Sequence, residues 1–96
     1  MRRKRFLVSY DISDDKRRNQ VFKTLYAYGD HAQFSVFFCE LSAMELAELR
    51  GKLRATLHEI EDQVMILDQG TAESPLEAGL ECLGRPYRPP ASVLVV

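Results

Sequence analysis

The stretch FLVSYDISDDKRR, residues 6–18, decides how this chain folds. In its first six residues, Phe6, Val8 and Tyr10 would face one side of a strand and Leu7, Ser9 and Asp11 the other. Both sides are partly apolar, which predicts a central strand buried on two faces. The strand ends at Asp11, and a helix follows, with Ser13 or Asp14 as its cap and acids in its first turn. A carboxylate at a strand end beside three bases (16–18) can hold a metal ion against a phosphate. The alternative is that Asp11 merely begins a turn.

The next two segments are a helix and an extended stretch. Val21, Phe22, Leu25 and Tyr28 follow helical spacing, and we expect Gly29 to stop the helix in a left-handed conformation. Residues 31–41 then alternate aromatic and β-branched side chains without glycine or proline. This periodicity alone predicts one long strand.

A second helix and a further strand follow. Residues 42–45 form a capping box before a leucine stripe, which we take as core. Residues 63–68 read as a short apolar strand ended by Gly70. Residues 74–83 carry a serine cap and a proline at the first helical position, which predict a minor helix ended by Gly84.

The end of the chain suggests a dimer. The proline-rich residues 85–90 must be extended and cannot join a central ladder, and residues 92–96 read as an apolar strand. We expect this arm and strand to pair with the sheet edge of a partner subunit. Pairing within the same subunit is the alternative.

Composition indicates a small cytoplasmic domain. The 96 residues are 46% hydrophobic and 28% charged, with no apolar run long enough to span a membrane. The basic start resembles that of a signal peptide, but the apolar segment after it is short and meets Asp11, which argues against export. Cys39 and Cys82 show no metal-ligand spacing, so we expect both to be buried thiols.

Charge is distributed unevenly along the chain. Residues 1–30 carry eight bases and four acids, whereas residues 31–96 carry five bases and ten acids. The asymmetry indicates either a basic face for phosphates or an unevenly charged, solvated surface.

Asp11 is half of a metal site at most. Magnesium requires one or two carboxylates plus substrate oxygens, and Asp14 and Asp15 lie on the helix start, where they can point to solvent. A two-fold axis near Asp11 would bring two copies together, and a bound cation could then activate water against a phosphodiester. His31 and His58 are isolated in sequence and suggest no rival catalytic set. We expect the aromatics near Asp11, Tyr10, Phe34 and Phe37, to pack in the core, with base stacking as the alternative.

Several short motifs resemble the CRISPR-associated protein 2 family. They are Tyr10-Asp11-Ile12 at the first strand's end, Lys16-Arg17-Arg18 on the helix, Leu25 through Tyr28-Gly29, and Gln33-Phe34-Ser35-Val36-Phe37. The match covers roughly residues 6–70. Their order and spacing are specific together and weak singly.

The resemblance implies an α+β, ferredoxin-like βαββαβ sandwich (residues 1–70). It implies a homodimer in which residues 71–96, a helix, a proline-rich arm and an extra strand, pack on the partner. It also replaces the single strand at 31–41 with two short strands turning near Ser35 and Val36. The chain departs from the family's usual pattern in two places. Phe38-Cys39 replaces more polar residues and bears on the rim of the site, and the proline-rich tail bears on how residues 71–96 dock.

The resemblance also implies the site. Asp11 is the expected catalytic residue and the ligand of Mg²⁺ or Mn²⁺ at the dimer interface. Tyr10, Arg17, Arg18, Ser35 and Phe37 are the expected nucleic-acid contacts.

Three functions follow as hypotheses. The leading one is a CRISPR adaptation protein that cleaves RNA or double-stranded DNA and is also a structural subunit of the spacer-integration complex. The second is a non-catalytic, DNA-binding scaffold that bridges dimers of the CRISPR integrase subunit. The third is a toxin-like ribonuclease of the same fold outside any CRISPR locus.

Overall fold

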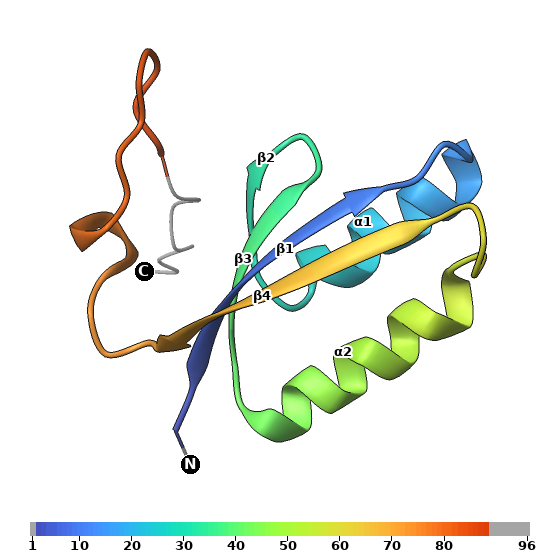
Figure 1. Ribbon diagram of the computed structural model, residues 1–96, viewed down its shortest axis with the longest axis horizontal. Coiled ribbons are helices and arrows are strands. Elements are labelled where there is room, and N and C mark those ends of the chain that lie inside the picture. The colour runs from blue at the N-terminus through green and yellow to red at the C-terminus, as the bar shows by residue number, and fades with distance from the viewer. Residues whose placement is uncertain (1, 89–96) are drawn as a thin grey trace, which may run out of the picture.

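The protein is described here from a computed structural model, which defines residues 2–88 (Figure 1). Four strands form one antiparallel sheet in the order β2-β3-β1-β4, and two helices cover one of its faces. The elements are β1 (Lys4–Asp11), α1 (Asp15–Tyr26), β2 (Asp30–Gln33), β3 (Val36–Leu41), α2 (Ala43–Thr56) and β4 (Gln63–Thr71). The predicted α+β, ferredoxin-like βαββαβ arrangement is thereby confirmed.

The central strand β1 buries only one of its faces. Phe6, Val8 and Tyr10 point into the core beneath the helices. Leu7 and Ser9, on the opposite face, are only half-buried, so the prediction of a strand buried on two faces is wrong for the described chain. Within residues 2–88, no α-helix covers that second face, which we call the open face of the sheet.

Helix α1 starts as predicted but stops differently. Asp14 is the N-cap, and its carboxylate accepts a hydrogen bond from the backbone nitrogen of Arg17 at 2.8 Å. Gly29 does not adopt the predicted left-handed conformation. Within residues 2–88, the glycines with positive φ are Gly70 and Gly84. Glycine is required at position 29 because an added Cβ would lie 2.4 Å from Sγ of Cys39.

The stretch from residue 31 to 41 is a hairpin, so the single strand predicted from periodicity is wrong. β2 and β3 are separated by a turn at Phe34 and Ser35, where the family resemblance implied one. The apolar alternation continues through the turn, which is why periodicity alone missed it.

Helix α2 confirms the capping box. The Ser42 hydroxyl accepts from the Glu45 backbone, and the Glu45 carboxylate accepts from the Ser42 backbone at 2.8 Å. The stripe of Leu46, Leu49 and Leu53 is buried against the sheet, as predicted. Burial of each such side chain stabilises the fold by roughly 1.5–3 kcal/mol.

Strand β4 and the segment after it differ from the predictions. β4 continues through Gly70 to Thr71. The minor helix predicted over residues 74–83 is a single 3₁₀ turn, Leu76–Ala78, without a side-chain cap. The strand predicted for residues 92–96 lies outside the described residues.

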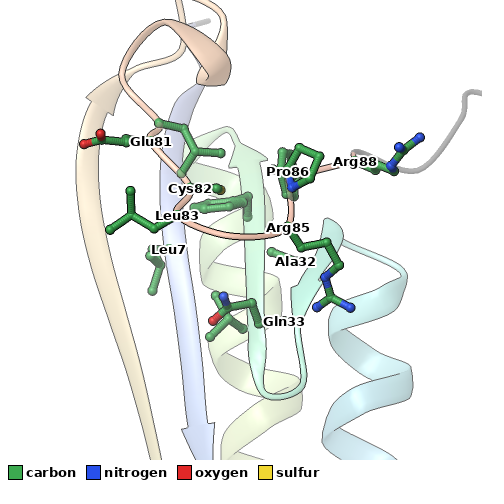
Figure 2. A pocket seen from close by; sticks show the side chains of 13 residues that line it. Leu7, Ala32, Gln33, Glu81, Cys82, Leu83, Arg85, Pro86 and Arg88 are labelled. Carbon is green, nitrogen blue, oxygen red and sulfur yellow. The ribbon is translucent and has the colours of Figure 1, made fainter.

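The segment of residues 80–88 folds over the open face. Together with Leu7, Val36 and Phe38 it lines an open cavity of about 670 Å³. Figure 2 shows the side chains that line the cavity, among them Cys82 and Leu83 of this segment and Leu7 and Gln33 of the sheet. The ring of Tyr87 meets that of Phe38 edge-on at 5.9 Å between centroids.

The two cysteines lie in different environments. Cys39 is fully buried, and burial raises the pKa of its thiol to about 11. Cys82 is exposed, so its predicted burial is wrong. Across residues 2–88, neither helix has the length and apolar character needed to cross a bilayer.

Candidate nucleic-acid site at the end of β1

Asp11 is the last residue of β1 and lies opposite Gln63 at the start of β4. Its side chain is exposed, and strand alternation places it on the open face with Leu7 and Ser9. Within residues 2–88, ion pairs engage the neighbouring acids Asp14, Asp15, Glu61 and Asp62, and none involves Asp11. In the part of the chain that the structure describes, Asp11 therefore offers a carboxylate without an ion-pair partner.

The two acids next to it in sequence are already engaged. Asp14 caps α1, and Asp15 forms an ion pair with Arg18. Within residues 2–88, no three His, Cys, Asp or Glu side chains gather into a metal site. One subunit thus provides one free carboxylate here, which fits Mg²⁺ because that ion keeps several waters and takes one or two protein carboxylates plus substrate oxygens.

Arg17 is held by acids of its own chain. Its Nε donates to the Asp62 carboxylate at 2.7 Å, and its terminal nitrogen donates to Glu61 at 3.2 Å. This joins the start of α1 to the loop between α2 and β4. Arg17 was predicted to contact nucleic acid, and in this subunit a phosphate would have to compete with both acids for it.

The Asp62 side chain is fully buried and anchors that loop. It also accepts a hydrogen bond from the backbone nitrogen of His58 at 2.9 Å. The hydrogen bond from Arg17 holds the pKa of Asp62 below its ordinary range, and the same carboxylate raises the pKa of Arg17. Since Asp62 directly precedes β4, this loop fixes the strand that pairs with Asp11.

Arg18 braces the connection after Asp11. Its guanidinium donates to the carbonyl oxygens of Ile12 at 3.0 Å and Ser13 at 3.1 Å, in addition to its ion pair with Asp15. Arg18 was also predicted to contact nucleic acid, and these bonds give it a second role in fixing the loop that begins at Asp11.

Tyr10 and Phe37, both predicted as nucleic-acid contacts, are core side chains in this subunit. They are 6% and 0% exposed, and their rings are stacked with centroids 6.5 Å apart. Burial raises the pKa of the Tyr10 hydroxyl, which donates to the carbonyl oxygen of Phe34 at 3.4 Å. Neither ring face is open to a base here.

The β2–β3 turn brings Ser35 and Phe34 to the same end of the sheet. Ser35, a predicted nucleic-acid contact, is half-buried, and its carbonyl oxygen accepts from the backbone nitrogen of Tyr10, the residue before Asp11, at 3.1 Å. Phe34 is 82% exposed, so its expected place in the core is wrong. Its position in a turn is the signal that could have identified it, and the periodicity hid that turn.

The basic leader does not form a free basic face. Each of its four bases makes an ion pair with an acid from a later element: Arg2 with Glu73, Arg3 with Glu45, Lys4 with Asp68 and Arg5 with Glu40. Exposed pairs of this kind stabilise little. The acids in these pairs nevertheless neutralise most of the basic leader. The uneven charge along the sequence, which had suggested a phosphate-binding face, therefore does not produce one at the leader.

The sequence and fold of this chain resemble those of known proteins. A family model described as CRISPR associated protein Cas2 matches residues 4–74. The chain is 38% identical over 82 residues to "CRISPR-associated endoribonuclease Cas2 1" of Rhodospirillum rubrum, covering 85% of this chain and 79% of that protein. It is 32% identical over 84 residues to "CRISPR-associated endoribonuclease Cas2" of Geobacter sulfurreducens, covering 88% and 87%.

Solved structures agree with the sequence relatives. The crystal structure of hypothetical protein TT1823 from Thermus thermophilus superposes with a TM-score of 0.77 at 33% identity, covering 91% of this chain and 98% of that one. Streptococcus pyogenes Cas2 at pH 6.5 gives a TM-score of 0.73 at 27% identity, covering 83% and 99%. With its fold, motifs and relatives in agreement, the chain belongs to the Cas2 family of CRISPR-associated proteins.

Proposed function

We propose that this protein is a metal-dependent endonuclease of CRISPR adaptation that acts as a homodimer in the cytoplasm. The observation that carries the proposal is the exposed Asp11 carboxylate, which ends the central strand while the acids around it are paired. Several relatives are named as endoribonucleases, which makes RNA the first substrate to test. Double-stranded DNA is the second.

The open face supports a homodimer. Met65 and Leu67 of β4 are 57% and 59% exposed, and register places Leu67 level with Leu7, which in turn lies level with Phe38. Residues 80–88 cover part of this apolar row at Leu7 and Phe38, whereas its end on β4 stays exposed to water, which is typical of an interaction surface. A second copy packed face to face would cover it, and a two-fold axis near Asp11 would bring both carboxylates together.

The residues then divide into two roles. Asp11 would hold Mg²⁺ or Mn²⁺, and Arg17 and Arg18 keep the loop and strand around it in place. When bound, the cation supplies positive charge against the phosphoryl oxygens of the scissile phosphodiester. Ser35, next to Tyr10 at the same end of the sheet, is the remaining polar group at the rim.

A scaffold is the second candidate function. It is favoured by the single free carboxylate per subunit and by the lack of any three-ligand cluster within residues 2–88. In this role the dimer bridges copies of the CRISPR integrase subunit during spacer acquisition and binds duplex DNA without cutting it. The two functions are compatible in one protein.

The test is a cleavage assay of wild type and Asp11→Ala on RNA and duplex DNA, with Mg²⁺, Mn²⁺ or EDTA. We expect cleavage that requires the cation and falls at least about 100-fold in Asp11→Ala, as for other groups that stabilise developing charge. Glu48→Ala, which removes an exposed acid from α2, is the matched control and should cleave normally. Cleavage that survives in Asp11→Ala contradicts the nuclease.

An acquisition assay separates the scaffold from the nuclease. If the scaffold is the function, Asp11→Ala still supports spacer acquisition, whereas a chain truncated before Ser92 does not. Acquisition by the truncated chain would argue against docking through the tail.

A further inference from the structure

Phe34 is an exposed aromatic ring held by a rigid turn. Although 82% of the residue is exposed, its own carbonyl oxygen accepts from the Tyr10 hydroxyl at 3.4 Å and from Nε2 of His31 at 3.3 Å. His31 is itself wedged between Phe22 and Phe37, with ring centroids 5.0 and 4.9 Å away. The backbone under the ring is therefore pinned to the core while the ring faces water.

The turn that carries this ring lies at the end of the sheet where Asp11 ends β1. In the β1–β3 ladder Ser9 lies opposite Val36, and the bond from the Tyr10 nitrogen to the Ser35 carbonyl continues the same register by one residue. The chain then turns at Ser35 and Phe34 into β2, and the Tyr10 hydroxyl donates to the Phe34 carbonyl oxygen at 3.4 Å. Phe34 is on the β2 side of the turn, and adjacent strands lie about 4.8 Å apart. Phe34 and Asp11 therefore share one end of the sheet, separated across it by roughly two strand spacings, about 10 Å.

We propose that Phe34 stacks on an unpaired base of the strand whose phosphodiester lies at Asp11. The inference rests on the proposed nuclease function and narrows its substrate to single-stranded nucleic acid. In a duplex both faces of a base are already stacked, whereas an unpaired base can place one face on an aromatic side chain. Phe34 is suited to this because its backbone is fixed and its ring has few rotamers to lose.

Phe34 is not the only exposed aromatic side chain within residues 2–88, and Tyr26 can be compared with it. Tyr26 is 63% exposed on α1, and its ring lies against Phe22 at 5.8 Å between centroids. It therefore serves as a matched control, an exposed aromatic away from the end of β1.

The chain contains no tryptophan, so a single substitution creates a specific reporter. Phe34→Trp and Tyr26→Trp are each titrated with a single-stranded oligonucleotide, its duplex form and an abasic strand, in EDTA so that nothing is cleaved. We expect saturable quenching of the indole fluorescence only for Phe34→Trp with the single strand. Phe34→Ala should weaken binding of the single strand by about ten- to a hundredfold and leave duplex binding unchanged.

The proposal is overturned if Phe34→Trp stays unquenched while the single strand binds, or if the abasic strand quenches it equally. It is also overturned if Phe34→Ala dissociates the dimer in light scattering, because the ring is then a subunit contact. Stacking is measured without metal, whereas the nuclease proposal fails in the cleavage assay of Asp11→Ala. The two failures are therefore distinguishable.

Discussion

Nε of Arg17 donates a hydrogen bond to the carboxylate of Asp62 at 2.7 Å, joining two residues 45 positions apart. The pair ties the start of α1 to the residue that precedes β4, and the two segments enclose the end of β1 where Asp11 lies. The positions of the segments around Asp11 therefore depend on the ion pair between Arg17 and Asp62, in which Asp11 takes no part.

A double-mutant cycle measures this dependence. Arg17→Ala and Asp62→Ala should each lower the melting temperature by a few degrees. The double variant should be no less stable than the worse single one, because each single change leaves a charged partner unpaired. Thermal unfolding followed by circular dichroism is the measurement. Additive losses would show that the two residues act independently.

The same pair predicts a pH dependence. The pKa of Asp62 is lowered in the folded chain, chiefly by the bond from Arg17. A lowered pKa contributes stability that is present above the ordinary aspartate pKa of about 3.9 and is lost as the pH falls through the folded value. Wild type should therefore be more stable than Asp62→Asn at pH 6, and the difference should shrink toward about pH 3. A gap that stays constant over this range would contradict the assignment.

The contact between Gly29 and Cys39 predicts a strong effect of one methyl group. A Cβ at position 29 would also lie 2.5 Å from the Phe38 carbonyl oxygen, so Gly29→Ala should destabilise the fold by about 1–3 kcal/mol. Cys39→Ala should restore only part of this loss, because the backbone clash remains. Denaturant unfolding gives both values.

Gly51→Ala is the control for that substitution. Gly51 lies within α2 with nothing inside 4 Å of an added Cβ, so alanine there should stabilise by roughly 0.5–1 kcal/mol. If Gly29→Ala and Gly51→Ala changed the free energy of unfolding equally, the close contact of residue 29 with Cys39 and Phe38 would not determine the need for glycine there.

The apolar row on the open face predicts the effect of a single charge. Leu67→Glu should raise the dissociation constant of the proposed dimer at least about 100-fold, since a buried carboxylate without a partner is costly. Because Leu67 is 59% exposed in the single subunit, the fold itself should persist. Light scattering over a range of concentrations tests this, with Ile60→Glu, on an exposed loop residue, as the control. A dimer that withstands Leu67→Glu uses another surface.

The sequence was most informative where local chemistry alone decides the structure. Asp14 and Ser42 cap their helices by bonds to residues three positions away, and such spacing can be read directly. The leucine stripe of α2 likewise identified part of the core, whereas the alternation of β1 did not reveal that one of its faces stays open. The caps and the leucine stripe need no knowledge of the rest of the fold.

Other features depend on partners distant in the chain. Periodicity cannot reveal that residues 34 and 35 turn, because apolar residues continue across them. The requirement for glycine at position 29 arises from the backbone of β3, and the engagement of Arg17 arises from Asp62. Family resemblance supplied the turn but could not show that Tyr10 is covered and Phe34 exposed within the subunit.

The central position of β1 has a consequence for how the protein is made. β1 is synthesised first, yet its two neighbours in the sheet are β3, ending at Leu41, and β4, ending at Thr71. The ribosome must therefore release most of the chain before the strand that carries Asp11 has a partner on each side. Pairings this distant in sequence form slowly, so an incomplete chain exposes an unpaired apolar strand that is prone to aggregate.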